Sequence, residues 1–333
     1  MPDSVTRVPS AILSHPAEKP EKLAFVLAGG GSLGSVEVGC LQALAERDIY
    51  PDLVVGTSVG SLNGAWIAMH PSKDGIHQLE EAWLALDNRT VFPSRGIRVM
   101  LRLLTGRDHI FSNQGIRYLV RHHLGGARFE DLQLPFFATA TELDTGKMTV
   151  FHSGPLEPAL LASTAIPGIF PPVFHNGHTY VDGAFVGNAS METAYRHGAT
   201  TIVVLTPPLQ QYDHEFGVLT PLERAMSASL KRISELEWTL YEERSEVLWF
   251  APIDESHEYR HDDFSHTEEL IQLSKQWMAG QLDKPYADPL RRWAGIAPRT
   301  EKPASKPRPD KVSAQAEIQA PGNTAAVPPT QTT

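Results

Sequence analysis

The sequence predicts an α/β fold built on a mainly parallel central sheet. Two short apolar runs, from Leu23 to Ala28 and from Leu53 to Val55, have the length and composition of strands that are buried on both faces. Each run ends in a glycine-rich turn, and each turn leads into a segment with apolar residues at helical spacing. Strands and helices that alternate through short turns are typical of parallel sheets.

The alternation of strand and helix signals continues to about residue 283. We expect helices over residues 34–47, 59–69, 157–165, 192–197, 220–246 and 265–278, and further strands over residues 136–141, 147–151, 173–175, 178–181, 201–206 and 247–251. The turn sequences Asp144-Thr145-Gly146 and Asn176-Gly177 predict two hairpins among these strands.

Two helices in the C-terminal half carry start signals. Thr220-Pro221-Leu222-Glu223 and Ser265-His266-Thr267-Glu268 both match the capping box, and Pro221 suits the first helical position. The first of these helices has one apolar face, formed by Leu222, Met226, Leu230, Ile233, Leu236 and Leu240.

The chain divides into three parts. Residues 1–21 are polar and interrupted by prolines, which predicts a flexible N-terminal arm. Residues 22–283 hold the strand and helix signals, and we interpret them as one domain. Residues 284–333 are expected to form a disordered tail rich in proline and alanine. From Arg299 onward this tail nearly lacks large apolar residues and cannot offset the entropy lost on ordering.

Composition excludes several classes of protein. The net charge of −10 argues against a nucleic-acid partner, since phosphate binding needs a basic face. The single cysteine, Cys40, excludes an intrachain disulfide and fits a reducing compartment. No segment has the roughly 18 consecutive apolar residues of a membrane span, and the N-terminus has no secretory signal. We expect a cytoplasmic protein, with peripheral membrane contact and oligomeric state left open.

Arginines are frequent between residues 89 and 121, at positions 89, 95, 98, 102, 107, 117 and 121. The favoured interpretation is that they lie on the solvated faces of amphipathic helices. The alternative is a mobile cover over an active site that meets an anionic head group or a membrane.

A lone serine marks the second strand-to-helix turn, in the pattern Gly56-x-Ser58-x-Gly60. A serine on such a turn projects its hydroxyl from the carboxyl edge of the sheet, and the flanking glycines let the backbone pass closely. The following helix directs its N-terminal dipole at this hydroxyl, which favours developing negative charge. The pattern therefore indicates a nucleophile.

The first turn carries the pattern Gly29-x-Gly31-x-x-Gly34, which has two interpretations. It fits the dinucleotide-binding fingerprint, but the acidic residue which that fingerprint requires at the end of the second strand is absent. The favoured interpretation makes the backbone N–H groups, chiefly those of Gly30 and Gly31, donors to an acyl oxyanion.

A serine nucleophile needs a base, and the residues alone do not select one among 14 histidines and many acids. Asp182 has a favourable setting, because it ends a predicted strand and Gly183 permits an exposed turn. A cluster of His257, His261, Asp262, Asp263 and His266 has no common metal-site spacing, and we expect no metal there.

Four ordered motifs together resemble the patatin-like phospholipase family. They are Gly29-Gly30-Gly31-Ser32-Leu33-Gly34, Gly56-Thr57-Ser58-Val59-Gly60, the segment ASTAIPGIFPPV from Ala162 to Val173, and Asp182-Gly183-Ala184. The resemblance extends from about Leu23 to residue 283. It implies a three-layer α/β/α fold and a Ser–Asp dyad in which Ser58 is the nucleophile and Asp182 the general base. It also implies an oxyanion hole at Gly29, Gly30 and Gly31.

The sequence departs from the family pattern at two positions. Leu33 stands where the family usually carries arginine or lysine, which puts a preference for anionic phospholipid head groups in doubt. Asn188-Ala189-Ser190 lacks the proline that commonly follows this asparagine, a change that we expect to alter only the turn.

The resemblance implies a serine lipid acyl hydrolase of phospholipase A, lysophospholipase or esterase type, which needs no cofactor or metal. Its expected partner is a lipid or another acyl ester. Three alternatives stay open. One is an α/β-hydrolase with a Ser–Asp–His triad that uses His197 or His257. The others are a lipid acyltransferase of the same layout and a non-catalytic module that binds lipid or nucleotide.

Overall fold

The computed structural model describes residues 21–92, 109–207, 220–253 and 259–293, and the structural statements below refer to these residues. Eight strands of this part of the chain form one sheet in the order β5-β6-β3-β2-β1-β7-β8, with β4 paired to β3 beside this path. The strands are β1 Leu23–Leu27, β2 Leu53–Thr57, β3 Phe136–Glu142, β4 Lys147–Phe151, β5 Val173–His175, β6 His178–Asp182, β7 Thr201–Leu205 and β8 Glu246–Phe250.

The centre of the sheet is parallel. Strand β1 pairs in parallel with β2 and β7, β2 pairs in parallel with β3, and β7 pairs in parallel with β8. The antiparallel pairs, β3–β4, β3–β6 and β5–β6, gather at one end of the strand order. The predicted α/β fold with a mainly parallel sheet is confirmed.

Helices cover both faces of this sheet. They are α1 Ser35–Ala45, α2 Val59–Met69, α3 Lys73–Leu84, α4 Asn88–Val91, α6 Gln114–Leu124, α7 Leu156–Ser163, α8 Met191–Arg196, α9 Thr220–Tyr241, α10 Thr267–Leu282 and α11 Asp288–Trp293. Short 3₁₀ helices are η1 Gly31–Gly34, η2 Phe129–Asp131, η3 Gly183–Phe185 and η4 Pro285–Ala287.

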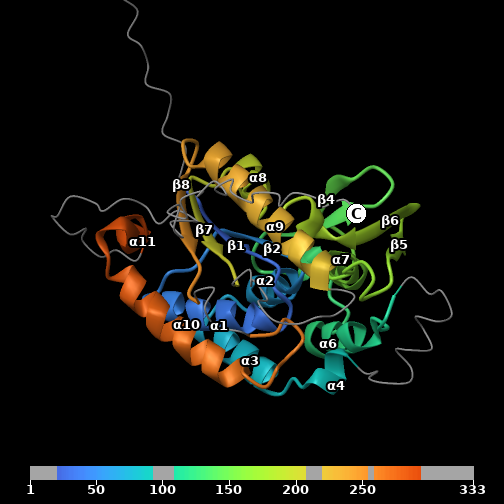
Figure 1. Ribbon diagram of the computed structural model, residues 1–333. Coiled ribbons are helices and arrows are strands. Elements are labelled where there is room, and N and C mark those ends of the chain that lie inside the picture. Colours follow the sequence, from blue (N-terminus) through green and yellow to red (C-terminus); the bar gives the residue numbers. More distant parts are fainter. Residues whose placement is uncertain (1–20, 93–108, 208–219, 254–258, 294–333) are drawn as a thin grey trace, which may run out of the picture.

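Side chains of β1 alternate between two cores. Leu23, Phe25 and Leu27 join the core that includes residues of α1, α2, α3 and α10, whereas Ala24 and Val26 join the core beneath α8 and α9. Figure 1 shows the same division, with α8 and α9 on one side of the sheet and α1, α3 and α10 on the other. The predicted three-layer arrangement is confirmed.

The predicted apolar face of the long helix α9 is wrong at its C-terminal end, whereas Leu230 lines a cavity and the side chains of Leu222 and Met226 lie outside the described part. Leu236 and Leu240 are 47% and 54% exposed, whereas Trp238 and Tyr241 are buried. Trp238 lies against Trp249 of β8, with ring centroids 6.1 Å apart, so the aromatic side of the helix covers the sheet. Aromatic rings bury more surface than leucines and here determine the orientation of the helix. The predicted helix also ends earlier, at Tyr241, and the side chains of the capping box at residues 220–223 lie outside the described part.

The start of α10 also differs from the prediction. The residue that caps it is His266 and not Ser265, and no side chain accepts a hydrogen bond from the first turn. The backbone N–H of Ser265 donates instead to Asp263 Oδ1 at 3.0 Å.

Helix α10 lies along α1 at very short range. A Cβ atom on Gly39 of α1 would lie 2.2 Å from the carbonyl oxygen of Ile271 in α10, so only glycine fits this position. The single cysteine, Cys40, is buried beside this contact, and burial raises the pKa of its thiol. Helix α10 is therefore an integral part of the layer that also contains α1.

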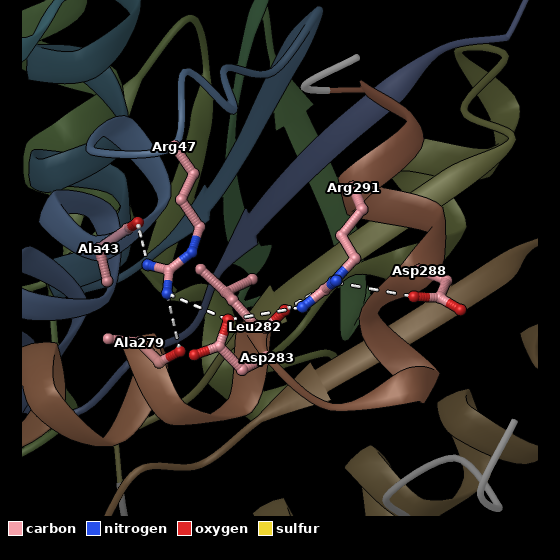
Figure 2. A network of polar contacts seen from close by, with 7 residues as sticks. All are labelled: Ala43, Arg47, Ala279, Leu282, Asp283, Asp288 and Arg291. Carbon is pink, nitrogen blue, oxygen red and sulfur yellow. Dashed lines mark hydrogen bonds and ion pairs between the residues drawn. The ribbon is translucent and has the colours of Figure 1, made fainter. Parts of the chain in front are cut away.

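The described part of the chain includes η4 and α11, up to residue 293, which corrects the predicted domain end at residue 283. Figure 2 shows how the added helix α11 is attached. Asp283 Oδ1 pairs with Arg47, which follows α1, at 3.5 Å and with Arg291 of α11 at 3.4 Å. The same guanidinium groups donate to carbonyl oxygens of α10, Arg47 to Ala279 at 3.0 Å and Arg291 to Leu282 at 3.1 Å. Two cations thus satisfy the C-terminal end of α10, where the helix dipole is negative.

Truncation tests this boundary. A chain that stops after Asp283 loses the fully buried Leu290 and the Arg291 contacts, whereas a chain that stops after Trp293 keeps both. We expect the shorter chain to lose at least about 2 kcal/mol of unfolding free energy, the contribution of one buried leucine. Denaturant unfolding of both truncated proteins measures the difference. Equal midpoints and slopes would restore the boundary at residue 283.

Candidate active site

Ser58 sits in a strained turn between β2 and α2. Its backbone has φ 54° and ψ −127°, a conformation that costs a non-glycine residue about 1–3 kcal/mol. Its N–H donates to Ser163 Oγ at 2.9 Å, and its carbonyl oxygen accepts from Ser61 Oγ at 2.6 Å. These bonds hold the turn so that the side chain reaches a cavity at the carboxyl edge of the sheet.

The glycines that flank Ser58 are required by close backbone approach. A Cβ on Gly56 would lie 2.4 Å from the carbonyl oxygen of Gly60, and a Cβ on Gly60 would lie 2.3 Å from that of Leu27. Helix α2 therefore begins directly against β1 and β2. This close contact fixes the position from which Ser58 projects.

Asp182 ends the antiparallel strand β6 and is 1% exposed. Its Oδ1 accepts a hydrogen bond from the N–H of Ala184 at 2.9 Å, and its own N–H donates to the carbonyl oxygen of Ala165 at 3.0 Å. The other carboxylate oxygen, Oδ2, is buried and has no hydrogen-bond partner among the described residues.

Burial raises the pKa of Asp182 to about 7. The Ser58 hydroxyl and the Ala184 N–H oppose this effect, because both stabilise the charged carboxylate. Ser58 is thus close enough to affect the carboxylate, although the two side chains do not meet the ordinary geometry of a hydrogen bond. Catalytic hydrogen bonds are often long in the unliganded state and shorten when substrate binds.

The glycine loop lies beside these two residues. A Cβ on Gly29 would lie 3.0 Å from Ser58 Cβ. The N–H of Gly29 donates to Asn188 Oδ1 at 2.9 Å and is therefore unavailable to an oxyanion, which corrects the prediction for this residue. No hydrogen bond within the described residues uses the N–H of Gly30 or Gly31. Gly31 has φ +59°, which favours glycine there.

The two remaining motif glycines support the site from outside. Gly34 ends η1, where a Cβ would lie 2.6 Å from the side chain of Val59. Gly183 starts η3, where a Cβ would lie 2.5 Å from the carbonyl oxygen of Thr139. Leu33 is fully buried with Val36, Tyr259 and Leu270 and does not line the cavity.

A cavity of about 660 Å³ joins Ser58, Asp182 and Gly29 to Gly31. Most of its wall is apolar and comes from α2, α3, α4, α6 and residues 166–170; the large side chains include Trp66, Leu79, Trp83, Phe92, Phe111, Val120, Leu124, Ile169, Phe170 and Phe264. Arg260 and three histidines, His109, His123 and His261, also line it. Burial lowers the pKa of His123, which favours its neutral form.

Two of the predicted arginines on α6 stabilise this wall. Arg117 and Arg121 both pair with Glu157 of α7, and these charges lower the pKa of the Glu157 carboxyl. They are thus partly fixed and not only solvated. The arginines at positions 95, 98, 102 and 107 lie outside the described residues.

Several residues that build the site have no local sequence signal for this role. Ser163 and Asn188, which bind Ser58 and Gly29, are fully buried. His261, assigned above to a histidine- and aspartate-rich cluster, has its Nδ1 2.9 Å from the carbonyl oxygen of Gly30. Asn188 was visible as a motif residue, but nothing local to the sequence marks the partners of these three side chains.

The structure describes one of the two histidines considered for a Ser–Asp–His triad. His197 ends α8, where its Nδ1 lies 2.8 Å from the carbonyl oxygen of Thr193 and its ring packs on Phe137, and it does not line the cavity. A triad with His197 is therefore not assembled. His257 lies outside the described residues. Within those residues, no group of three or more metal-ligating side chains gathers.

Comparison with known proteins identifies the family. A sequence model of the patatin-like phospholipase family matches residues 25–195, about half of the chain. These residues include the glycine loop, the Ser58 turn and the Asp182 turn. The chain therefore belongs to the patatin-like phospholipase family.

Individual relatives match over a shorter share of their own length. Patatin-like phospholipase domain-containing protein 7 of Rattus norvegicus is 31% identical over 185 residues, which are 55% of this chain and 13% of the relative. Lysophospholipase NTE1 of Cryptococcus neoformans is 28% identical over 193 residues, 56% of this chain and 11% of the relative. The chain thus spans only a small part of the length of these relatives.

Among solved structures, VipD from Legionella pneumophila is similar with a TM-score of 0.46 and 13% sequence identity, over 79% of this chain and 67% of that one. No helix within the described ranges is long and apolar enough to cross a membrane.

The burial of Asp182 predicts a pH-dependent stability. The folded protein retains a proton on this carboxyl up to a pKa of about 7, whereas the unfolded chain releases it near 3.8. Stability therefore falls as pH rises from about 4 to 7 and stays lower above that range. We expect Asp182→Asn to remove this loss, so that at pH 8 the variant is more stable than wild type by up to about 4 kcal/mol.

Denaturant unfolding at pH 4 and pH 8 measures this effect. The asparagine keeps the acceptor for the Ala184 N–H, so the stability difference between variant and wild type reports the charge. A difference that does not change with pH would contradict the raised pKa.

Proposed function

We propose that this protein is a serine lipid acyl hydrolase, of phospholipase A, lysophospholipase or esterase type. The observation that carries the proposal is the joint placement of Ser58 and Asp182 in one mostly apolar cavity of about 660 Å³. The family membership supports lipid esters as the substrate class.

Acylation begins when the Asp182 carboxylate accepts the proton of the Ser58 hydroxyl, directly or through one water. Ser58 Oγ then attacks the ester carbonyl, and the carbonyl oxygen becomes a negatively charged oxyanion. The N–H groups of Gly30 and Gly31 stabilise this charge, and one such donor typically contributes about 3 kcal/mol. The C–O bond to the alcohol breaks, and the protonated Asp182 returns its proton to the leaving alcohol.

Deacylation repeats these steps with water. Asp182 accepts a proton from a water molecule, whose oxygen attacks the acyl-enzyme carbonyl. The bond to Ser58 Oγ breaks, Ser58 regains a proton, and a free fatty acid leaves. A carboxylate of ordinary pKa is a weak base for a serine, and the raised pKa of Asp182 makes it stronger.

The wall of the cavity supports an acyl chain as the bound group. Its large side chains are aliphatic or aromatic, and they gain stability when an apolar chain displaces water. A lipid ester also requires access to a membrane or lipid aggregate, so the proposal includes peripheral contact with such a surface. Transfer of the acyl group to an acceptor alcohol in place of water would give the acyltransferase alternative.

Active-site labelling tests the nucleophile. A fluorophosphonate probe reacts with an activated serine, so we expect it to label wild-type protein and not Ser58→Ala. Ser245→Ala is the control, since this buried serine donates to the carbonyl oxygen of Ala199 and does not line the cavity. A folded wild-type protein that neither reacts nor cleaves a short-chain ester would support the non-catalytic alternative.

The pH profile tests the base. With the pKa of Asp182 at about 7, kcat/KM for p-nitrophenyl butyrate should rise about tenfold per pH unit below 7 and level off above it. Asp182→Asn should lower kcat at least about 100-fold at pH 8, the lower range for loss of a general base. A flat profile between pH 5 and 9, or near wild-type turnover in the variant, would remove Asp182 from the mechanism.

A further inference from the structure

Residues 260–261 bind the glycine loop from a part of the chain that lies outside the family match. The carbonyl oxygen of His261 accepts from the N–H of Ser32 at 2.9 Å, and that of Arg260 accepts from Ser32 Oγ at 2.9 Å. The third bond joins His261 Nδ1, as the donor, to the carbonyl oxygen of Gly30 at 2.9 Å. Two residues from the C-terminal region thus make three contacts with two residues of the loop, Gly30 and Ser32.

The contact with Gly30 determines the direction of the next N–H group. In a trans peptide the C=O and N–H bonds point to opposite sides, and the described residues contain no cis peptide. The carbonyl of Gly30 and the N–H of Gly31 belong to the same peptide. A donor that holds this carbonyl on one side therefore directs the N–H of Gly31 to the other side.

This peptide needs an external support. It lies between two glycines, which have no Cβ to restrict rotation of the peptide plane. Within the loop, only the N–H of Leu33 also donates to the carbonyl of Gly30, at 3.1 Å. The approach of residue 261 is close, since a Cβ on Gly31 would lie 2.4 Å from the carbonyl oxygen of His261.

Helix α10 holds this support in place. The segment with His261 leads directly into α10, which lies along α1, and α1 follows the glycine loop (Figure 1). The Gly39 contact and the Arg47–Asp283 pair fix the two helices against each other. The loop and the segment that supports it therefore start from a common rigid base.

We propose that His261 is a positioning residue for the oxyanion hole. Its imidazole donates from Nδ1 to the carbonyl of Gly30 and thereby aligns the N–H of Gly31 with the oxyanion formed on the substrate. This inference rests on the proposed function, because it assigns a residue to the same acyl-transfer reaction. It gives His261 no proton transfer and no contact with the nucleophile.

A matched pair of substitutions tests the proposal. His261→Asn places an amide N–H near the position of Nδ1, whereas His261→Leu has a similar size and no donor. We expect His261→Leu to lower kcat for p-nitrophenyl butyrate at least tenfold with little change in KM, and the fluorophosphonate labelling rate to fall in parallel. His261→Asn should recover most of both rates. His266→Ala is the control, because this histidine lies in the same segment and contacts Glu269, not the loop.

Three results would separate the possibilities. If wild-type protein neither reacts with the probe nor cleaves the ester, the proposed function fails before the variants are compared. If wild type is active and His261→Leu has a kcat within twofold of it, the positioning role is wrong. Equal losses in the Asn and Leu variants, with rates expressed per titrated active site, would also overturn it, since only the Asn side chain restores the donor.

Discussion

The backbone of Ser58 is the constraint on which the rest of the structure depends. A serine at φ 54° is stable only where its neighbours hold it. The close approach of Gly56 and Gly60 fixes α2 against β1 and β2, and Ser163 binds the N–H of Ser58 from α7. The central position of β2 in the sheet makes this turn rigid. The packing at the carboxyl edge of the sheet therefore offsets the backbone strain of Ser58.

The burial of Asp182 is a second energetic cost in the same site. Asp182 is buried with one oxygen unpaired, and burial alone shifts its pKa towards neutrality. A fold selected only for stability would place a neutral or better-paired side chain at this position. The same burial makes the carboxylate a stronger base, so the instability and the proposed catalytic role have one physical origin. The strained backbone of Ser58 and the desolvated carboxylate of Asp182 thus lie together, where the turn after β2 meets the turn after β6.

Local features of the sequence predicted much of the fold and part of the site. The strands β1, β2 and β7 consist mainly of continuous apolar runs, which are visible in the sequence. The two tight turns are also visible there, because their glycines indicate where the backbone must pass closely. The partners of these turns depend on tertiary contacts. Asn188 binds Gly29 across a sequence separation of 159 residues, and His261 binds Gly30 across 231. No local sequence pattern predicts contacts between residues so far apart in the chain. The predicted burial of Leu236 and Leu240 on α9 is wrong for a related reason, because the packing of Trp238 on Trp249 is also a tertiary contact.

The position of β7 in the sheet limits how this protein can be cut and recombined. Strand β7, Thr201–Leu205, pairs with β1 along its whole length, yet it follows the block of residues 25–195 that matches the family. That block transplanted alone would leave β1 as an exposed edge, with unpaired backbone groups open to another chain. It would also lack the support that the C-terminal region gives to the glycine loop. A functional chimera therefore has to exchange the two parts together, as one continuous unit from β1 to α11.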